Sequence, residues 1–506
     1  MGRGSNPRVV LYSPRAWGPY RPTQGAPLPL LAISSFLEQA GYDIVIVSSN
    51  LSDRPTEDVL ESCRNATCLG ITAMTGYQIT DGLEIARSVK ERYPDLPVVW
   101  GGRHPTLEPD GTIKSPYVDI LVRGQGERTF AELVHSLAEG KSLGNVAGIS
   151  YERFGEILHN PGRPLEDVND FPPMPYHLID VERSIYSNAF SNRVLNYVSS
   201  YGCPFRCGFC SEQTVWERRW LALRTDRMVE DIEGLVKDYG VDTIALADSE
   251  FFIDKERARL FCEEITRRGL KINWCNANGR IPQLLKYEDD MWHLIAESGC
   301  REILVGAESG YQPALDLMQK DMRVEETIAF AEKCRKYDIK VVFSMLCGLP
   351  WHRDYQKTAK LTETETRHTL ELADELTRLN KRNKIILSSY TPYPGSPLYT
   401  RSLEIGLVPP DSLDKWADWI EQLNTCPWVS SRQARKFEML NYIFFFLDTD
   451  SCEWLSSLIR NRIFRYLFKM AFQLYSLLPR LRWKYHFFAF PADRWLYQYF
   501  KNRHRG

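Results

Sequence analysis

Long apolar runs, a strong net charge and a biased composition are all absent from this sequence of 506 residues. No stretch reaches the roughly 18 uncharged apolar residues that a transmembrane helix needs. The first residues are polar and no small-residue cleavage site follows the first apolar run, so we expect no signal peptide and a cytoplasmic protein. A formal net charge of −2 argues against nucleic-acid binding by the chain as a whole. With 43% hydrophobic and 25% charged residues, the sequence predicts a folded enzyme rather than a disordered chain.

Residues 8–140 alternate short β-branched runs with amphipathic stretches of helical periodicity. This α/β alternation predicts a doubly wound parallel sheet, which binds ligands in the loops beyond the carboxyl ends of its strands. We assign residues 1–160 to this domain, including a closing hairpin at 148–159, and residues 161–195 to a proline-rich linker. The predicted strands are Arg8–Ser13, Ile44–Val47, Leu69–Thr72, Val98–Trp100 and Ile120–Val122, and the predicted helices are Leu28–Ala40, Gly82–Arg92 and Arg128–Leu137.

Strand–helix alternation resumes at a longer period between residues 196 and 400. Six βα steps predict a partial (β/α)6 TIM barrel with its functional loops at the carboxyl-terminal rim. Strand signals then stop, so we expect residues 401–506 to form a helical region that includes Arg432–Leu447, Leu455–Leu478 and Ala492–Lys501. The predicted barrel strands are Tyr197–Ser200, Thr243–Ala247, Ile272–Cys275, Ile303–Val305, Val341–Met345 and Ile385–Ser389.

Three of the 12 cysteines are clustered directly after the first predicted barrel strand. Cys203, Cys207 and Cys210 lie in YGCPFRCGFC, whereas the other nine are scattered singly and are interpreted mostly as buried thiols. Three thiolates hold three irons of a [4Fe–4S] cube and leave the fourth iron open for a ligand. Structural zinc is the alternative, but it normally takes four protein ligands, and no fourth cysteine or histidine follows at a matching spacing.

The cysteine triplet, with Phe209 before its last member, resembles the radical SAM superfamily. The resemblance implies that S-adenosylmethionine (SAM) binds the open iron and is cleaved to a 5′-deoxyadenosyl radical. The stretches ALADSEFF, WCNANGRI, GAESG, CGLP and YPGSPLY match SAM-contacting motifs of that superfamily in the expected order. Asp248–Ser249 replaces the usual glycine pair, so the ammonium group of SAM has two candidate partners, Asp248 and Glu250. The implied SAM contacts are Phe209, Asp248, Glu250, Arg280, Glu308 and Ser309.

The first domain lacks G-x-G-x-x-G after its first strand, which argues against a dinucleotide site. Its later strands are followed by GITAMTGYQITDG, VVWGGRHPTLEPD and VDILVRGQGERTF, whose glycines let the backbone approach a bulky ligand closely. This set resembles the cobalamin-binding domain that is joined to many radical SAM enzymes. The implied cobalamin contacts are Thr72, Met74, Thr75, Gly76, Tyr77, Gly101, Gly102, His104, Pro105, Gly124, Gly126 and Glu127.

Two positions depart from the cobalamin-domain pattern. The cobalt-ligating motif D-x-H-x-x-G is absent, and only His104 and His135 precede residue 150. We therefore expect cobalt to be bound without a histidine ligand, with the Met74–Tyr77 loop under the corrin and His104 at the corrin tail or in solvent. Gln125 stands where the usual G-E-G-E has its first glutamate.

The last 56 residues are basic and aromatic. Positions 451–506 contain 11 lysines and arginines, 15 aromatic residues and only Glu453 and Asp493 as acids, a local charge of +9. Three interpretations fit: a helical cap on the barrel, an interfacial helix on anionic headgroups, and an RNA-binding surface. We favour peripheral contact with the inner face of the membrane, because a cap alone does not call for this charge, and we expect no nucleic acid. At helical spacing, the apolar positions are Leu458, Phe464, Leu467, Phe468, Phe472, Leu474 and Leu478, and the basic ones are Arg460, Arg462, Arg465 and Lys469.

Together, the motifs of residues 8–400 predict a cobalamin-dependent radical SAM methyltransferase with a [4Fe–4S] cluster, SAM and cobalamin as cofactors. The expected substrate is a lipophilic small molecule or a membrane lipid, methylated at an unactivated carbon, and the expected electron donor is of the flavodoxin or ferredoxin type. A cyclase that forms a ring without methyl transfer is the alternative, because it uses the same cofactors. A non-catalytic cobalamin or redox sensor is disfavoured by the complete set of SAM motifs. Cys347, beside a strand-end loop, is either a hydrogen donor or a buried thiol.

Overall fold

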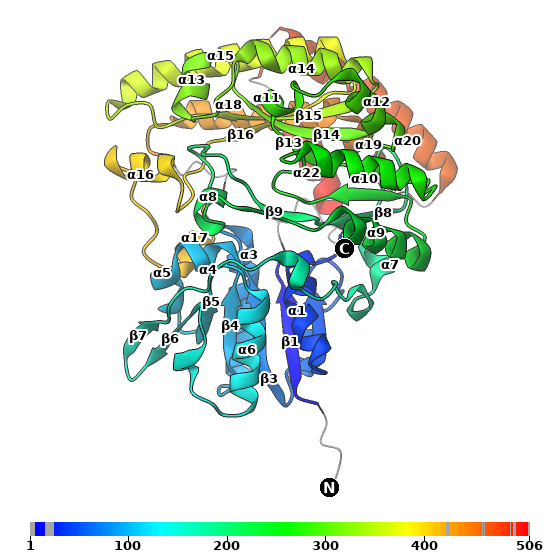
Figure 1. The fold of residues 1–506 in the computed structure, drawn as a ribbon. Coiled ribbons are helices and arrows are strands. Elements are labelled where there is room, and N and C mark those ends of the chain that lie inside the picture. Colours follow the sequence, from blue (N-terminus) through cyan, green and yellow to red (C-terminus); the bar gives the residue numbers. More distant parts are fainter. Residues whose placement is uncertain are drawn as a thin grey trace.

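The computed structural model describes residues 6–15, 25–420, 426–457, 459, 461–485, 487–488 and 492–503. Figure 1 shows two α/β bodies, an N-terminal one drawn in blue and cyan and a second one in green and yellow, with most of the C-terminal helices packed on the second. The expected fold class, a doubly wound sheet followed by a partial barrel and a helical region, is confirmed.

The N-terminal sheet has the strand order β2-β1-β3-β4-β5-β6-β7, with parallel pairing from β2 to β5 and antiparallel pairing beyond. Successive residues of β1 face opposite sides of the sheet: Val9 and Leu11 pack in one apolar cluster, and Val10 and Tyr12 in the other. Both faces are therefore buried under helices. The strands are β1 (Arg8–Ser13), β2 (Asp43–Ser48), β3 (Ala66–Thr72), β4 (Val98–Gly101), β5 (Ile120–Val122), β6 (Ile149–Arg153) and β7 (Glu156–His159).

The helices of this domain differ from the predicted ones in number and length. Helix α3 begins at Tyr77 rather than at Gly82, so part of the GITAMTGYQITDG loop is helical. Three helices that the sequence pattern did not indicate are α2 (Pro55–Ser62), α4 (Arg103–Leu107) and α5 (Pro109–Ile113). The others are α1 (Leu28–Gln39), α3 (Tyr77–Arg92) and α6 (Glu127–Ala138).

The barrel consists of six parallel steps, of which the third is split. Asn276, with φ of 57°, separates β12 from β13, and its side-chain amide donates to the Leu246 carbonyl at 3.1 Å. The first strand ends at Tyr197, earlier than predicted, because Ser200–Gly202 turns aside as β9 and pairs with β10 (Trp220–Ala222). The barrel strands are β8 (Val194–Tyr197), β11 (Thr243–Leu246), β12 (Asn273–Cys275), β13 (Ala277–Gly279), β14 (Glu302–Glu308), β15 (Lys340–Cys347) and β16 (Lys384–Ser389).

Helices surround these strands. The longest, α15, packs on β15 and α14. Helices of the linker and barrel are α7 (Val181–Ser184), α8 (Glu212–Val215), α9 (Thr225–Tyr239), α10 (Lys255–Arg267), α11 (Ile281–Leu284), α12 (Asp289–Glu297), α13 (Gln312–Leu317), α14 (Val324–Lys336), α15 (Tyr355–Leu379) and α16 (Pro397–Glu404).

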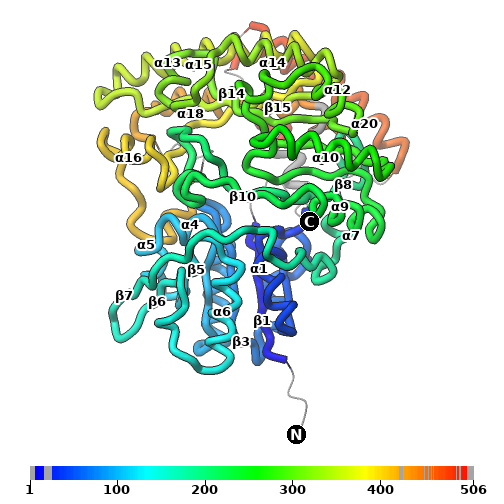
Figure 2. The backbone as a smooth tube through the Cα atoms, viewed as in Figure 1, coloured from blue at the N-terminus to red at the C-terminus, as the bar shows by residue number. Residues whose placement is uncertain are grey.

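The C-terminal region packs helix α18 along β16, the last barrel strand, so the open side of the barrel is covered. The single helix expected over Leu455–Leu478 is wrong: Asn461 caps a new helix, α20, which runs along the outer edge of the second body (Figure 2). Leu458 and Arg460 lie outside the described residues. The helices are α17 (Leu413–Trp416), α18 (Ser431–Leu447), α19 (Thr449–Ser457), α20 (Arg462–Tyr475), α21 (Leu477–Lys484) and α22 (Ala492–Arg503).

Candidate functional site

A cavity of about 380 Å³ lies between the N-terminal sheet and the barrel. Its floor includes Thr72, Gly101 and Val122, at or beside the carboxyl ends of β3, β4 and β5, where a doubly wound sheet binds its ligands. Tyr201 of β9 and Ser249, after β11, line it from the barrel side. The cavity is therefore shared by both bodies.

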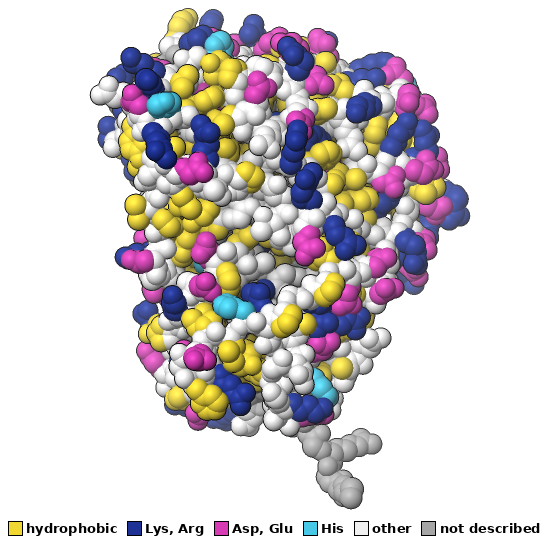
Figure 3. Space-filling view, turned by 60° about the vertical axis from the view of Figure 1, so that its left-hand side comes forward, with side chains coloured by type: hydrophobic (Ala, Val, Ile, Leu, Met, Phe, Trp, Pro, Cys, Tyr) yellow, Lys and Arg dark blue, Asp and Glu magenta, His cyan; other side chains and the backbone are white. Residues whose placement is uncertain are grey.

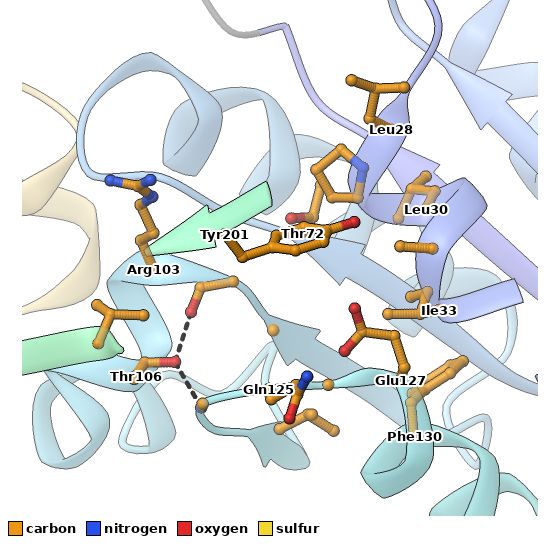
Figure 4. A pocket seen from close by; sticks show the side chains of 18 of the residues that line it. Leu28, Leu30, Ile33, Thr72, Arg103, Thr106, Gln125, Glu127, Phe130 and Tyr201 are labelled. Atoms are coloured by element: carbon orange, nitrogen blue, oxygen red, sulfur yellow. Dashed lines mark hydrogen bonds between the residues drawn. The ribbon is translucent and has the colours of Figure 1, made fainter. Parts of the chain in front are cut away.

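Two glycine loops shape the cavity floor. Gly102 has φ of 99°, and a Cβ there would lie 2.9 Å from the Ala73 carbonyl oxygen, so only glycine fits without strain. Gly124 has φ of 71° beside open space. Thr106 holds the loops together, since its hydroxyl donates to the Gly102 carbonyl at 2.7 Å and accepts from the Gly124 N–H at 3.0 Å (Figure 4).

The structure brings most of the proposed cobalamin contacts to this cavity. The glycine floor, together with apolar walls from Leu30, Ile33 and Phe130 (Figure 4), fits a broad, largely apolar ring system such as a corrin. Burial raises the pKa of Glu127, at the start of α6. Thr75, Gly76, Tyr77, His104 and Pro105 do not line the cavity, whereas Thr72, Met74, Gly101, Gly102, Gly124, Gly126 and Glu127 do.

His104 is fully buried beneath the C-terminal region. Its Nδ1 lies 3.0 Å from the Thr75 hydroxyl, and its ring packs edge-on against Trp416 of α17 at 5.4 Å between centroids. Burial lowers its pKa to about 4, so the imidazole is neutral. Of the described residues that line the cavity none is a histidine.

The three clustered cysteines are half-buried free thiols on a loop that the barrel holds in place. The Gly208 N–H donates to the Met318 carbonyl and its carbonyl accepts from the Leu398 N–H, both at 2.7 Å. The Gln213 amide donates to the carbonyls of Cys207 and Cys210 at 3.1 and 3.0 Å. Burial raises the pKa of Cys203 to about 12 and that of Cys210 to about 11, so metal binding must displace protons.

The thiols suit a cluster better than a single ion. Among the described residues, no three His, Cys, Asp or Glu side chains converge closely enough to hold one metal ion. Structural zinc would gather its thiolates at about 2.3 Å from one centre, whereas an iron–sulfur cube spreads them over separate irons. The donor set, three cysteines of one loop, therefore fits a [4Fe–4S] cluster.

Charged side chains surround the cysteine loop on the barrel side. The Arg280 guanidinium donates to the Cys207 sulfur at 3.7 Å and stacks over the Phe205 ring at 4.1 Å. Lys320 is buried, and its ammonium donates to Glu308 at 2.6 Å and lies 5.7 Å from the Phe209 ring. Lys320 was not among the predicted site residues, although it lies ten positions after GAESG, at the end of the stretch LDLMQK.

The two candidate partners for an ammonium group have different surroundings. Asp248 accepts from the Ser199 N–H at 2.6 Å and from the hydroxyls of Ser199 and Ser200 at 2.5 and 2.8 Å, so both of its oxygens are engaged. Glu250 accepts hydrogen bonds from the backbone N–H groups of Phe252, at 3.3 Å, and of Arg280, and burial raises its pKa to about 8. Glu250 therefore accepts fewer hydrogen bonds than Asp248 does, and none of them comes from a side chain.

Ser309 and Cys347 lie among packed side chains, away from the cavity. The Ser309 hydroxyl is buried and lies 3.0 Å from that of Thr369 on α15. Cys347 is completely buried, its pKa is raised by burial, and hydrogen bonds join it to Thr366 and Thr369 on the same helix. The structure thus places Cys347 as a buried thiol outside the lining of the cavity.

Arg103 and Glu212 were not singled out by the sequence and connect the two halves of the site. Arg103 lines the cavity from α4, and Glu212 begins α8 just after Cys210. The Ser249 hydroxyl donates to Glu212 at 2.6 Å. A polar chain therefore runs from the cavity to the cysteine loop.

Comparisons with known proteins match these two bodies separately. Residues 20–134 match the family described as B12 binding domain, and residues 197–362 match the Radical SAM superfamily. An uncharacterized methyltransferase of Pyrococcus horikoshii is 27% identical over 429 residues, covering 84% of this chain and 88% of that protein. The anaerobic magnesium-protoporphyrin IX monomethyl ester cyclase of Rubrivivax gelatinosus is 28% identical over 378 residues, covering 72% of this chain and 64% of that protein.

A solved structure resembles this fold over nearly the whole chain. The cobalamin-dependent S-adenosylmethionine radical enzyme OxsB, with aqua-cobalamin and S-adenosylmethionine bound, superimposes with a TM-score of 0.71 at 18% identity. The match covers 99% of this chain and 75% of that chain.

Proposed function

Because the chain joins a B12-binding domain to a radical SAM domain and is thus a radical SAM enzyme, we propose that it methylates an unactivated carbon of a lipophilic substrate. The observation that best supports this proposal is the cavity shared by the two bodies. Its floor belongs to the B12-binding domain, and its upper lining belongs to the barrel that holds the cysteine loop. A substrate bound there would meet both reactive centres at once.

When bound, cobalamin would carry the methyl group, and SAM at the reduced cluster would supply the radical that removes a hydrogen atom from carbon. The residues of this chain would bind and orient these cofactors. Cys203, Cys207 and Cys210 would hold the cluster, Glu250 would bind the ammonium group of SAM, and the glycine floor would support the corrin. The expected electron donor, a flavodoxin or ferredoxin, supplies the reducing equivalents from outside.

A lipophilic substrate is supported by the lining of the cavity. On the barrel side, above the floor that would hold the corrin, Val198, Val215, Trp216 and Ala247 give it apolar walls, and charged lining residues are few. Such walls bind hydrocarbon surface by removing it from water. The relative from Pyrococcus horikoshii bears the name of a methyltransferase, which supports methyl transfer.

Ring formation without methyl transfer is the second candidate. The similarity to the cyclase of Rubrivivax gelatinosus supports it, and that reaction would use the same cavity and cysteine loop.

The test is anaerobic turnover of the cobalamin-loaded protein with reductant, trideuteromethyl-SAM and a membrane lipid extract from the source cells. We expect 5′-deoxyadenosine together with a product that carries the labelled methyl group, as read by mass spectrometry. A Cys203→Ala variant should form neither. An unlabelled product that has lost hydrogen would favour the cyclase, and deoxyadenosine with no altered lipid would overturn the lipophilic substrate.

A further inference from the structure

Helices α20 and α21 present an apolar stripe to solvent. Its members recur at alternating spacings of four and three residues, which places them on one face of a helix. In an ordinary surface helix the apolar face would point to the core. In α20 and α21 this face points to solvent, and the side that carries Phe472 and Trp483 packs on the core. The exposed fractions are 71% for Ile463, 52% for Leu467, 52% for Met470, 71% for Leu474, 51% for Leu477 and 51% for Leu481.

Packing on the opposite side fixes this orientation. Phe472 is buried against Phe446 of α18, with 5.6 Å between ring centroids. The Trp483 ring packs on Phe444 at 4.9 Å. Lys469 pairs with Glu453 at 2.6 Å, which ties α20 to α19. The stripe is therefore held outward by the fold.

The charged residues of the segment that carries the stripe are all basic. No acidic residue occurs between Glu453 and Asp493, and both of these are paired, with Lys469 and Arg482 respectively. Arg462 and Arg480 are exposed beside the stripe. On the face shown in Figure 3, by contrast, acidic and basic side chains are interspersed.

We propose that this surface, the stripe with Arg462 and Arg480, docks onto an anionic lipid bilayer. Leucine, isoleucine and methionine side chains would enter the acyl region, and the arginines would meet phosphate headgroups. A contact between two copies of the chain through this surface would bring like charges together, which disfavours a dimer. No helix among the described residues is long and apolar enough to cross a bilayer. The proposal stands independently of the reaction in the cavity.

Sedimentation of the full-length protein with vesicles tests it. We expect binding to phosphatidylcholine vesicles that contain phosphatidylglycerol, and roughly tenfold or more weaker binding by a Leu467→Gln/Leu474→Gln variant, because apolar insertion and charge attraction act together. The matched control is Leu260→Gln/Val408→Gln, which removes exposed apolar side chains (42% and 81%) elsewhere and should bind as wild type does. Added salt should weaken the binding of the wild-type protein to the vesicles, because salt screens charge attraction. It should change the binding of Arg462→Gln/Arg480→Gln less.

All substituted side chains are exposed, so each variant should unfold at the wild-type temperature. No binding to anionic vesicles, or equal loss in the control variant, would overturn the proposal. A wild-type dimer in solution that Leu467→Gln/Leu474→Gln converts to monomer would also overturn it, because the stripe would then be a contact between copies of the chain.

Discussion

Arg103 and Glu212 form an ion pair across the domain interface, with the Arg103 Nη2 2.5 Å from the Glu212 Oε1. Arg103 belongs to α4 of the N-terminal domain, and Glu212 begins α8, just after the clustered cysteines. The Glu212 side chain is only 7% exposed, whereas that of Arg103 is 41% exposed. A nearly buried carboxylate thus depends on a cation from the other domain.

Loss of this cation should destabilise the protein. Arg103→Gln leaves the Glu212 carboxylate without its counter-ion, and because Arg103 is partly solvated we expect a cost of about 1–2 kcal/mol, below that of breaking a fully buried pair. Urea unfolding of Arg103→Gln, Glu212→Gln and the double variant measures it. Additive effects of the two single changes would show that the pair contributes nothing.

Gly102 is expected to tolerate no side chain. Gly102→Ala forces a Cβ into the Ala73 carbonyl at a backbone angle that L-residues rarely adopt, so we predict a loss of roughly 1–3 kcal/mol and weaker retention of cobalamin on gel filtration. Gly111→Ala is the matched control, because open space surrounds that position in α5. Similar losses in both variants would contradict the steric argument.

Only the three clustered cysteines should be needed for iron. Cys203→Ala, Cys207→Ala and Cys210→Ala should each lose the cluster absorbance and most of the bound iron after anaerobic reconstitution, since two thiolates leave the cube under-ligated. Cys334→Ala, which removes a thiol buried in α14, should keep both. Stoichiometric zinc in the wild type would favour the structural-zinc alternative.

Substitutions of Asp248 and Glu250 should have different effects, on stability in the first case and on SAM binding in the second. Asp248→Asn turns one of the two acceptor oxygens into an amide donor that faces the donor groups of Ser199 or Ser200, so it should lower the unfolding temperature. Glu250→Gln should leave that temperature nearly unchanged and weaken SAM binding by about tenfold, the loss of one charge-assisted hydrogen bond. Equilibrium dialysis with labelled SAM measures the affinity. Unchanged affinity in Glu250→Gln would remove Glu250 from the SAM site.

Glu365 should make stability depend on pH. It is completely buried, and although it accepts from the Gly348 N–H at 3.1 Å, burial raises its pKa from 4.5 to about 8. A raised carboxyl pKa means that its stabilising contribution is complete below pH 4.5 and is lost as the pH rises toward 8. Glu365→Gln should therefore gain stability relative to wild type over that range, by at most about 1.4 kcal/mol per pH unit. A difference in unfolding free energy between the two proteins that stays constant from pH 4.5 to 8 would contradict this prediction.

Much of the fold followed from sequence periodicity. Every strand of the N-terminal sheet up to β5 was predicted near its observed position, because most of these strands are buried and form apolar runs in the sequence. The boundaries that failed depend on single contacts. Asn276 divides a barrel strand through a left-handed backbone, and Asn461 starts α20 with a side-chain cap. A single residue of this kind leaves the hydrophobic periodicity of the sequence unchanged, so the periodicity could not predict either boundary.

The site was only partly predictable, because some of its contacts join residues that are far apart in the sequence. Motif spacing places Cys203, Cys207 and Cys210 on one loop, since neighbours in sequence stay neighbours in space. Spacing cannot tell that Trp416 covers His104, more than 300 positions earlier in the chain, because that contact depends on how the C-terminal region packs.

The sequence by itself determined the two α/β bodies, the cysteine loop and the glycine loops, because these features depend on local periodicity, spacing and backbone freedom. Tertiary structure alone decided which acid accepts fewer hydrogen bonds, Glu250 rather than Asp248, since hydrogen bonds from a neighbouring strand end occupy the latter. It also decided that the apolar stripe of α20–α21 points outward, because packing against α18 chooses one face of an amphipathic helix and leaves the other to solvent.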